Sequence, residues 1–328
     1  MSKITAAITA VNGYVPEKIL TNKDLEKLVD TNDEWIMSRT GIKERRIAGK
    51  GEALSDFGKK IVDGILKKRG IAAEEIDMLI VGSITGDYRF PSASNVICDK
   101  SGLTNAWGFD VSAACSGFLY ALDVGKTYIE NGTHKKIIVI GADVMSSIIN
   151  YKDRATCIIF GDGGGGVLLE PNEEGLGIQD TVLKVDGSGR EFLIQKIGGS
   201  AEPITKENVE TEGQYVYQEG QTVFKHAVKN MADISVEIME RNQLTAEDID
   251  WLAPHQANLR IIDATASRMG LDHDKIMINI QKYGNTTSGT IPLLLWEYEN
   301  KLKKGDNIVL AAFGGGFTWG AIYIKWAY

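Results

Sequence analysis

The chain has 328 residues, of which 43% are hydrophobic and 24% charged, a balance that excludes a disordered or collagen-like protein and leaves room for two domains. Its formal net charge of −8 disfavours nonspecific binding to nucleic acid. No apolar run is long enough to span a membrane, and the start Met-Ser-Lys-Ile-Thr lacks the pattern of a secretory signal. We therefore expect a cytoplasmic protein without a membrane or nucleic-acid partner.

Apolar runs that end in glycine alternate along the chain with segments of helical periodicity. The periodicity predicts helices over residues 54–69, 116–130, 223–241 and 292–302. The apolar runs predict strands at 137–141 and 309–316. This alternation favours an α/β protein with layers around a largely parallel sheet.

Two pairs of segments repeat at nearly the same offset. The acidic pentad 73–77 recurs at 246–250, an offset of 173. A Ser-Gly pair, a helix and an apolar strand beginning at Ser116 line up with the same series beginning at Ser288. We therefore predict two similar halves, residues 1–171 and 172–328. Residues 172–220 have no counterpart in this pairing, so we expect them to form extra hairpins and loops that cap a site.

Three cysteines, Cys98, Cys115 and Cys157, form no Cys-x-x-Cys pair, which disfavours a zinc knuckle or a disulfide framework. We predict no metal site, and packing roles for Cys98 and Cys157. Cys115 differs because an apolar strand turns there through small residues directly into a helix. The free N–H groups and the dipole of a helix N-terminus favour a thiolate, so we predict that Cys115 is a nucleophile.

Two polar residues in the second half are candidates to act with Cys115. His255 follows an apolar strand, at the end where open α/β sheets bind ligands. The duplication places Asn285 near Cys115, where two helix N-termini meet. The other three histidines lie in hydrophilic or helical stretches, and we predict no role for them.

Two glycine clusters follow apolar runs. The cluster within 312–320 follows a predicted strand, where bare glycines permit backbone N–H groups to approach a bound carbonyl. The cluster 161–166 superficially resembles a dinucleotide-binding loop, but it leads from one apolar run into another. A phosphate loop needs a helix next, so we predict a hairpin or bulge between two strands.

Cys115, His255 and Asn285, with their flanking sequences, strongly resemble β-ketoacyl-[acyl-carrier-protein] synthase III, the initiating condensing enzyme of type II fatty acid synthesis in the thiolase superfamily. The resemblance covers nearly the whole chain, and its segments are 33–36, 39–42, 90–92, 110–122, 153–154, 159–162, 255–260, 283–286 and 313–320. It implies a thiolase-like duplicated αβαβα five-layer fold and a homodimer. One departure is the run of four glycines at 163–166, where the family more often has Gly-Ala-Gly-Ala.

The resemblance implies a reaction in two steps with no cofactor beyond its substrates. A short acyl-CoA, with an acetyl or branched acyl group, acylates Cys115. Malonyl-acyl-carrier-protein then loses CO2 and attacks this thioester, which gives 3-oxoacyl-acyl-carrier-protein. Neutral His255 and the amide of Asn285 would stabilise the enolate, and the N–H groups of Cys115 and Gly315 would hold the other oxyanion.

The resemblance also implies binding residues on the surface. Five would bind CoA, with the adenine held between the first two: Trp35, Arg154, Thr31, Arg39 and Asn258. Lys225 and Arg260 would receive the acidic acyl carrier protein. Phe90 would reach across a dimer interface to form the floor of the partner's acyl pocket.

Four other functions are weighed against this one. A papain-like protease also has Cys, His and Asn in this order, with a similar Cys-to-His spacing, but the flanks of Cys115 do not match. A thiolase would be expected to have a second cysteine in its last glycine loop, and 312–320 contains none. An acyltransferase of secondary metabolism could use the same three residues. A non-enzymatic carrier-binding protein would tolerate Cys115→Ala and form no acyl adduct.

Overall fold

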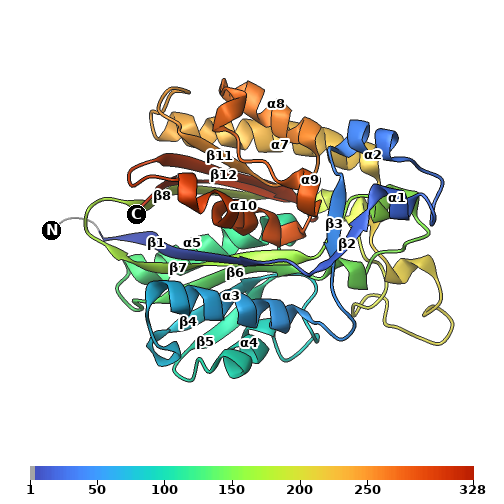
Figure 1. The fold of residues 1–328 in the computed structure, drawn as a ribbon, viewed down its shortest axis with the longest axis horizontal. Helices are drawn as coiled ribbons and strands as arrows, with labels where there is room; N and C mark the ends of the chain where they lie inside the picture. Colours follow the sequence, from blue (N-terminus) through green and yellow to red (C-terminus); the bar gives the residue numbers. More distant parts are fainter. Residues whose placement is uncertain (1–3) are drawn as a thin grey trace.

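Two β-sheets alternate with three layers of helices through the molecule (Figure 1). The computed structural model describes residues 4–328. Residues 1–3, part of the start considered above for a secretory signal, lie outside the described residues. Within residues 4–328, no helix is both long enough and apolar enough to cross a membrane.

The first sheet has the strand order β1-β7-β6-β4-β5. Its strands are β1 (Thr5–Tyr14), β4 (Met78–Gly82), β5 (Trp107–Val111), β6 (Ile137–Asp143) and β7 (Gly163–Asn172). β4 is parallel to both β5 and β6, whereas β7 runs antiparallel to β6 and β1. Every residue of β6 is buried, because helices cover both faces of the sheet.

The second sheet has the order β11-β12-β13-β8. Its strands are β8 (Gly177–Val185), β11 (Trp251–Pro254), β12 (Asn307–Gly314) and β13 (Thr318–Lys325). β11 and β12 are parallel, and β13 runs antiparallel to both β12 and β8. This sheet therefore repeats the arrangement of β4, β6, β7 and β1 in the first.

The helices form an outer layer on each side and one layer between the sheets (Figure 1). The outer helices of the first sheet are α3 (Leu54–Arg69) and α4 (Ala93–Ser101). α7 (Gly220–Arg241) covers the second sheet, and α8 (Leu259–Met269) packs beside it. α5 (Gly117–Glu130) and α10 (Thr290–Tyr298) lie between the sheets. The predicted duplicated five-layer fold is confirmed, whereas the division at residue 171 stays a prediction.

The predicted helices agree with the structure to within a few residues. The helix over 54–69 matches α3 at both ends, and α5 begins one residue later than predicted. α7 begins at Gly220, three residues early. The helix over 292–302 is predicted to start two residues late, since α10 covers Thr290–Tyr298 and a 3₁₀ turn continues to Lys301. Residues 290–295 of α10 are all buried, so the start of this helix shows no single apolar face.

The prediction that 172–220 has no counterpart is wrong for β8. This strand pairs antiparallel with β13 as β1 pairs with β7. Sequence comparison missed it because a strand pairs through its backbone and needs only suitable alternation of side chains. Residues 186–219 form turns and the two short strands β9 (Leu193–Ile194) and β10 (Tyr217–Gln218).

The prediction of a strand-to-strand hairpin at the first glycine cluster is also wrong. The short helix α6 (Arg154–Cys157) precedes the cluster, and glycines 163–166 are the first four residues of β7, between β1 and β6. A Cβ on Gly165 would lie 2.9 Å from the backbone carbon of Pro292 in α10. Gly165 therefore allows the central helix to lie against the sheet.

We expect Gly165→Ala to lower the free energy of unfolding by about 1–3 kcal/mol, because the added methyl group meets backbone that cannot rotate away. Chemical denaturation measures this change. The matched control is Gly199→Ala, where no atom lies within 4 Å of the new Cβ. Equal stability of the two variants would contradict the packing argument.

The remaining elements form the end of the molecule that carries α1 and α2 (Figure 1). They are β2 (Lys18–Thr21), α1 (Asn22–Leu25), α2 (Asp33–Thr40), β3 (Glu44–Ile47) and α9 (Ile280–Tyr283). α2 contacts α8, and α9 contacts β3. Residues from the start of the chain thus reach the second half.

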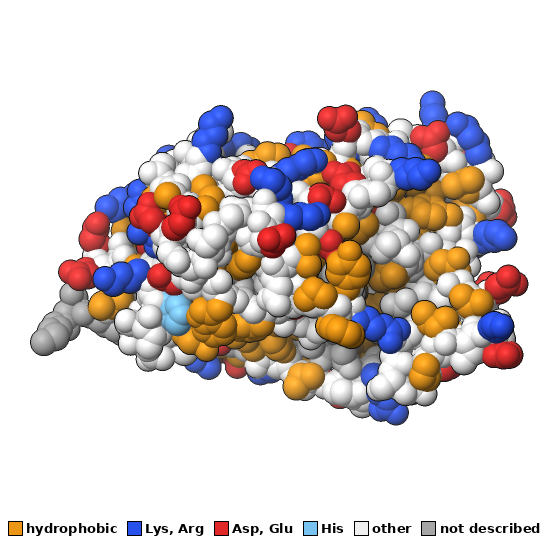
Figure 2. Space-filling model, turned by 90° about the horizontal axis from the view of Figure 1, so that it is seen from below, with side chains coloured by type: hydrophobic (Ala, Val, Ile, Leu, Met, Phe, Trp, Pro, Cys, Tyr) orange, Lys and Arg blue, Asp and Glu red, His pale blue; other side chains and the backbone are white. Residues whose placement is uncertain are grey.

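One face of the molecule carries charges of both signs. In Figure 2, Lys and Arg side chains lie among Asp and Glu, and hydrophobic side chains form small patches between them. This face has no broad basic field of the kind that binds a nucleic-acid backbone.

Candidate active site

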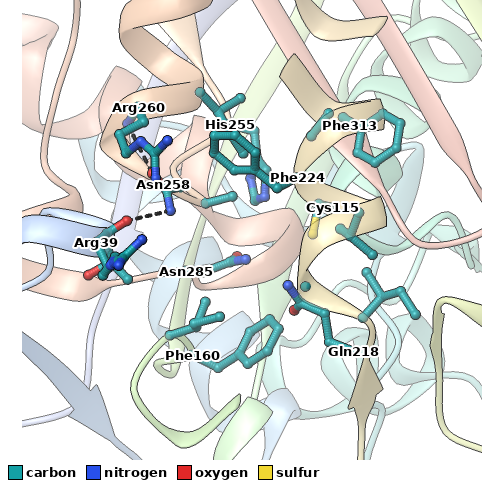
Figure 3. Close-up of a pocket in the computed structure, with 18 of the residues that line it drawn as sticks. Arg39, Cys115, Phe160, Gln218, Phe224, His255, Asn258, Arg260, Asn285 and Phe313 are labelled. Atoms are coloured by element: carbon teal, nitrogen blue, oxygen red, sulfur yellow. Dashed lines mark hydrogen bonds between the residues drawn. The ribbon is translucent and has the colours of Figure 1, made fainter. Parts of the chain in front are cut away.

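A cavity of about 640 Å³ extends from the protein surface to the three residues predicted to be catalytic. Its lining includes exposed Arg39 and Arg260 and buried Cys115, His255 and Asn285. Figure 3 shows these side chains around one space. The structure therefore brings together the three residues that the sequence singled out.

Cys115 lies in a tight turn between β5 and α5. Residues 114–116 form a 3₁₀ turn, and Ala114 has a φ of 45°, which is rare for a residue with a side chain. Thr287 has a φ of 55° in the equivalent turn before α10. The two turns contact each other. The duplication therefore brings two left-handed turns, each at a helix start, to one point.

Asn285 is held so that its amide nitrogen is available to the cavity. Its Oδ1 accepts a hydrogen bond from the N–H of Thr287 at 2.8 Å. Its backbone N–H donates to the carbonyl of Ile159 at 2.9 Å, and its carbonyl accepts from the N–H of Gly161 at 3.0 Å. These bonds fix the side chain beside Cys115.

His255 is buried at the end of β11, with 2% of its surface exposed. Its backbone N–H donates to the carbonyl of Ala311 at 2.8 Å. Ring nitrogen Nδ1 lies 2.7 Å from Oγ1 of Thr290, whereas Nε2 is buried without a partner among residues 4–328. Burial lowers the pKa of the imidazole to about 3, so the ring is neutral near pH 7.

The expected thiolate at Cys115 is not supported in the unliganded chain. Burial, with a smaller effect of the carboxyl group of Asp143, raises the pKa of the thiol to about 12. The amide of Asn285 and the backbone N–H of Cys115 act in the opposite direction but do not offset burial. Cys115 is therefore a thiol near pH 7, and its reaction as a nucleophile requires a proton acceptor.

The residues expected to bind CoA lie at the outer end of this cavity. The guanidinium of Arg154 lies 5.1 Å from the ring centroid of Trp35 and donates to the carbonyl of Asp30 at 3.0 Å, next to Thr31. Nδ2 of Asn258 donates to the carbonyl of Arg39 at 2.8 Å. Three of the five line the cavity: Trp35, Arg39 and Asn258.

Positive charge lies beside the cavity on α7 and α8. The guanidinium of Arg260 is 4.8 Å from the ring centroid of Phe224, which also lines the cavity. Lys225 is the next residue of α7 and is exposed. These two cations are accessible to an acidic partner.

The last glycine cluster lies against the backbone of Cys115. A Cβ on Gly314 would lie 2.7 Å from the backbone nitrogen of Cys115. Gly314 lines the large cavity, and Gly315 lines a second, smaller cavity that also reaches Cys115. The turn between β12 and β13 therefore approaches the thiol through backbone alone.

The second cavity has a volume of about 230 Å³. Most of its lining is apolar, with Met145, Ile148, Leu193 and Val216 among the residues. Phe90 is 86% exposed and lines neither cavity of the single chain, so its predicted role in a partner subunit stays a prediction.

The other two cysteines lie outside both cavities. Cys157 is buried and Cys98 is partly buried, and neither forms a disulfide. Among residues 4–328, no group of three or more His, Cys, Asp or Glu side chains is arranged to hold a metal ion.

Comparison with known proteins gives one answer over the whole chain. The family model described as 3-oxoacyl-[acyl-carrier-protein (ACP)] synthase III matches residues 109–187, and that of its C terminal matches 239–326. A β-ketoacyl-[acyl-carrier-protein] synthase III of Porphyromonas gingivalis is 54% identical over 100% of this chain and 98% of its own length. The chain belongs to the synthase III family.

Two further synthase III proteins agree with this assignment. One from Chlorobium phaeovibrioides is 55% identical over 98% of this chain and all of its own length. The crystal structure from Aquifex aeolicus has a TM-score of 0.90 at 38% identity, and the match covers 98% of this chain and 100% of that one. The chain is thus a condensing acyltransferase of fatty acid synthesis, and a secondary-metabolism acyltransferase is not favoured.

Sequence reasoning missed several residues of this synthase III cavity. Gln218 of β10 and Phe313 of β12 line it near Cys115 (Figure 3). Thr290 contacts His255 from behind. No motif marks Gln218. Thr290 could have been noticed from the repeat, because it is the first residue of α10 and the equivalent first residue of α5, Gly117, has no side chain.

We expect the imidazole of His255 to remain neutral from about pH 5 to pH 8, because its pKa is lowered to about 3. Nitrogen-15 NMR of the free protein measures this, with the signal assigned by its loss in His255→Asn. Since the unfolded chain binds this proton more readily than the folded one, His255 also makes the fold less stable as pH falls below its ordinary pKa. A titration midpoint between pH 6 and 7 would contradict the expectation.

Proposed function

We propose that Cys115, His255 and Asn285 carry out the initiating condensation in two half-reactions at the large cavity. The observation that carries this proposal is their convergence. A buried thiol, a neutral imidazole with an unpartnered Nε2 and a fixed amide face one space. This combination can accept an acyl group, move a proton and stabilise an oxyanion.

In the first half-reaction, Nε2 of His255 takes the proton of the Cys115 thiol. The sulfur then forms a bond to the carbonyl carbon of a short acyl-CoA. As the carbon–sulfur bond to CoA breaks, the CoA sulfur takes the proton from Nε2. The N–H groups of Cys115 and Gly315 hold the oxyanion, in keeping with the approach of the glycine turn to this sulfur.

In the second half-reaction, malonyl-acyl-carrier-protein loses CO2, and the negative charge moves to the thioester oxygen. The amide of Asn285 and a proton on Nε2 of His255 stabilise this enolate. The enolate carbon attacks the acyl group, and the sulfur of Cys115 leaves and takes the proton from Nε2. This half-reaction consumes one proton from the solvent. Nε2 takes it up because the bound malonyl carboxylate favours a charged imidazole, although the ring is neutral in the free protein.

The substrates are placed by the surface around the cavity. Five residues at its outer end bind CoA: Thr31, Trp35, Arg39, Arg154 and Asn258. Lys225 and Arg260 attract the acidic carrier protein, and the small apolar cavity beside Cys115 takes the acyl chain. The active form is a cytoplasmic homodimer in which Phe90 completes the partner's acyl cavity, and the reaction needs no further cofactor.

The test is to incubate the purified protein with acetyl-CoA and a panel of branched and longer acyl-CoAs, and to read the intact mass and the modified peptide. We expect an acyl adduct confined to Cys115, and none in Cys115→Ser. The preferred chain identifies the primer. No adduct from any acyl-CoA would contradict the proposed first half-reaction.

A further inference from the structure

The contact between His255 and Thr290 bears on which ring nitrogen of the neutral imidazole carries the proton. Nδ1 of His255 and Oγ1 of Thr290 are 2.7 Å apart, and both side chains are 2% exposed. Oγ1 also lies 3.3 Å from the carbonyl of Thr287 and can donate to it. Three groups therefore form a chain from the ring to the turn that carries Asn285.

We propose that Thr290 is a positioning residue that holds the proton of His255 on Nδ1 and leaves Nε2 as an acceptor facing the Cys115 side of the cavity. In this arrangement, Nδ1–H donates to Oγ1, and the hydroxyl donates to the carbonyl of Thr287. This inference rests on the role of His255 proposed above. The nitrogen that carries the proton in a neutral imidazole is set by the bond that its other nitrogen makes.

The opposite arrangement loses one hydrogen bond and does not suit the proposed reaction. If the hydroxyl donated to Nδ1, the carbonyl of Thr287 would lose this donor. Nε2 has no partner among residues 4–328 in either arrangement, so the contacts of Nδ1 decide between them. With its proton on Nε2, the neutral ring could not take a proton from the Cys115 thiol.

The duplication shows that the contact between His255 and Thr290 belongs to the second half alone. At the offset of 173, His255 and Thr290 correspond to Gly82 and Gly117 in the first half. There, a Cβ on Gly82 would lie 2.6 Å from the backbone carbon of Gly117, so that corner has no space for side chains. In the second half, the same corner holds an imidazole and a hydroxyl within hydrogen-bond distance. The pair is thus a feature of the half that carries His255.

The hydrogen bonds from His255 through Thr290 to Thr287 also favour proton transfer from Cys115 to Nε2. When Nε2 takes a proton, the ring becomes a cation in a buried site, which is unfavourable without polar contacts. A hydrogen bond from Nδ1–H to Thr290, extended to the carbonyl of Thr287, stabilises this cation. Thr290 therefore acts through His255 in each step in which Nε2 gains a proton, without contacting the substrate.

The test compares Thr290→Val, which keeps the shape and removes the hydroxyl, with Thr290→Ser, which restores it. We expect Thr290→Val to acylate Cys115 from acetyl-CoA about 10- to 100-fold more slowly, less than the roughly 10²- to 10⁴-fold that a proton-transfer group itself contributes, because His255 is retained and only its orientation is lost. We expect Thr290→Ser to recover most of the rate. The control is Thr265→Val in α8, which loses a buried hydroxyl outside both cavities and should acylate at the original rate.

Nitrogen-15 NMR reports the tautomer of His255, which would not change if Thr290 only supported the fold. We expect Nδ1 to carry the proton in the original protein and in Thr290→Ser, and a mixture of tautomers in Thr290→Val. A proton on Nε2 in the original free protein would overturn the inference, and so would Thr290→Val with an unchanged tautomer and rate. Failure of the original protein to form any adduct would instead contradict the proposed function, and the NMR result would still decide the tautomer.

Discussion

Asn285→Asp slows condensation with malonyl-acyl-carrier-protein by a factor of about 10²–10³, the loss seen when one oxyanion donor is removed. The substitution keeps the oxygen that accepts from the N–H of Thr287 at 2.8 Å, so the loop retains its anchor. It removes the amide donor and places a carboxyl group where the enolate charge develops. Acylation of Cys115 by acetyl-CoA should fall less, because that step has its own oxyanion donors and loses only the amide that favours the thiolate of Cys115.

Two measurements on the same preparation separate the half-reactions. Intact mass after mixing with acetyl-CoA follows acylation, and release of CO2 after addition of malonyl-acyl-carrier-protein follows condensation. An equal loss in both would show that Asn285 acts mainly on the position or ionisation of Cys115. Condensation at the original rate would remove Asn285 from the proposed oxyanion site.

Gly314→Ala impairs both half-reactions, and we expect a loss of about 10²-fold or more in each. The new methyl group would lie 2.7 Å from the backbone nitrogen of Cys115, so either the turn or the nucleophile must move. A displacement of about 1 Å at a reacting group is enough for a loss of this size. The change is steric and adds no charge or polar group.

Gly315→Ala is the matched control for this prediction. The atoms nearest to a Cβ there belong to Leu193, the first at 3.4 Å, which is ordinary contact, and the backbone N–H proposed for the oxyanion is retained. We expect its acylation rate to change by no more than a few-fold. Similar losses in both variants would indicate that the whole turn, rather than the approach of Gly314 to Cys115, determines the effect.

The layered fold could be predicted because its signals are local and repeated. The helix at 54–69 has apolar residues at helical spacing on one face only, and its predicted ends match α3. The start of α10 was predicted two residues late, since its residues 290–295 are all buried and show no single apolar face. β8 was missed because strand pairing depends on backbone partners rather than on sequence identity.

The proximity of Cys115 and Asn285 could be predicted from the repeat offset, but the pKa of Cys115 could not. A helix N-terminus is visible in sequence, and it led to an expected thiolate. Burial of the sulfur is a property of the folded chain, and it raises the pKa of Cys115 instead. Gln218 was missed for a similar reason, because its β10 strand of two residues enters the cavity from a long irregular segment.

The paired left-handed turns before α5 and α10 have a consequence for symmetry. An assembly of two identical halves would present the same side chain twice where the turns meet. The two turns, 114–116 and 287–289, place Cys115 opposite Ser288, one residue away from the Ser-Gly match seen in the sequence. The hydroxyl of Ser288 donates to the carbonyl of Gly82 at 2.6 Å and so contributes to the framework. Joining the halves in one polypeptide frees each copy to specialise: one supplies the reactive atom, and the other supplies the scaffold and the polar partners.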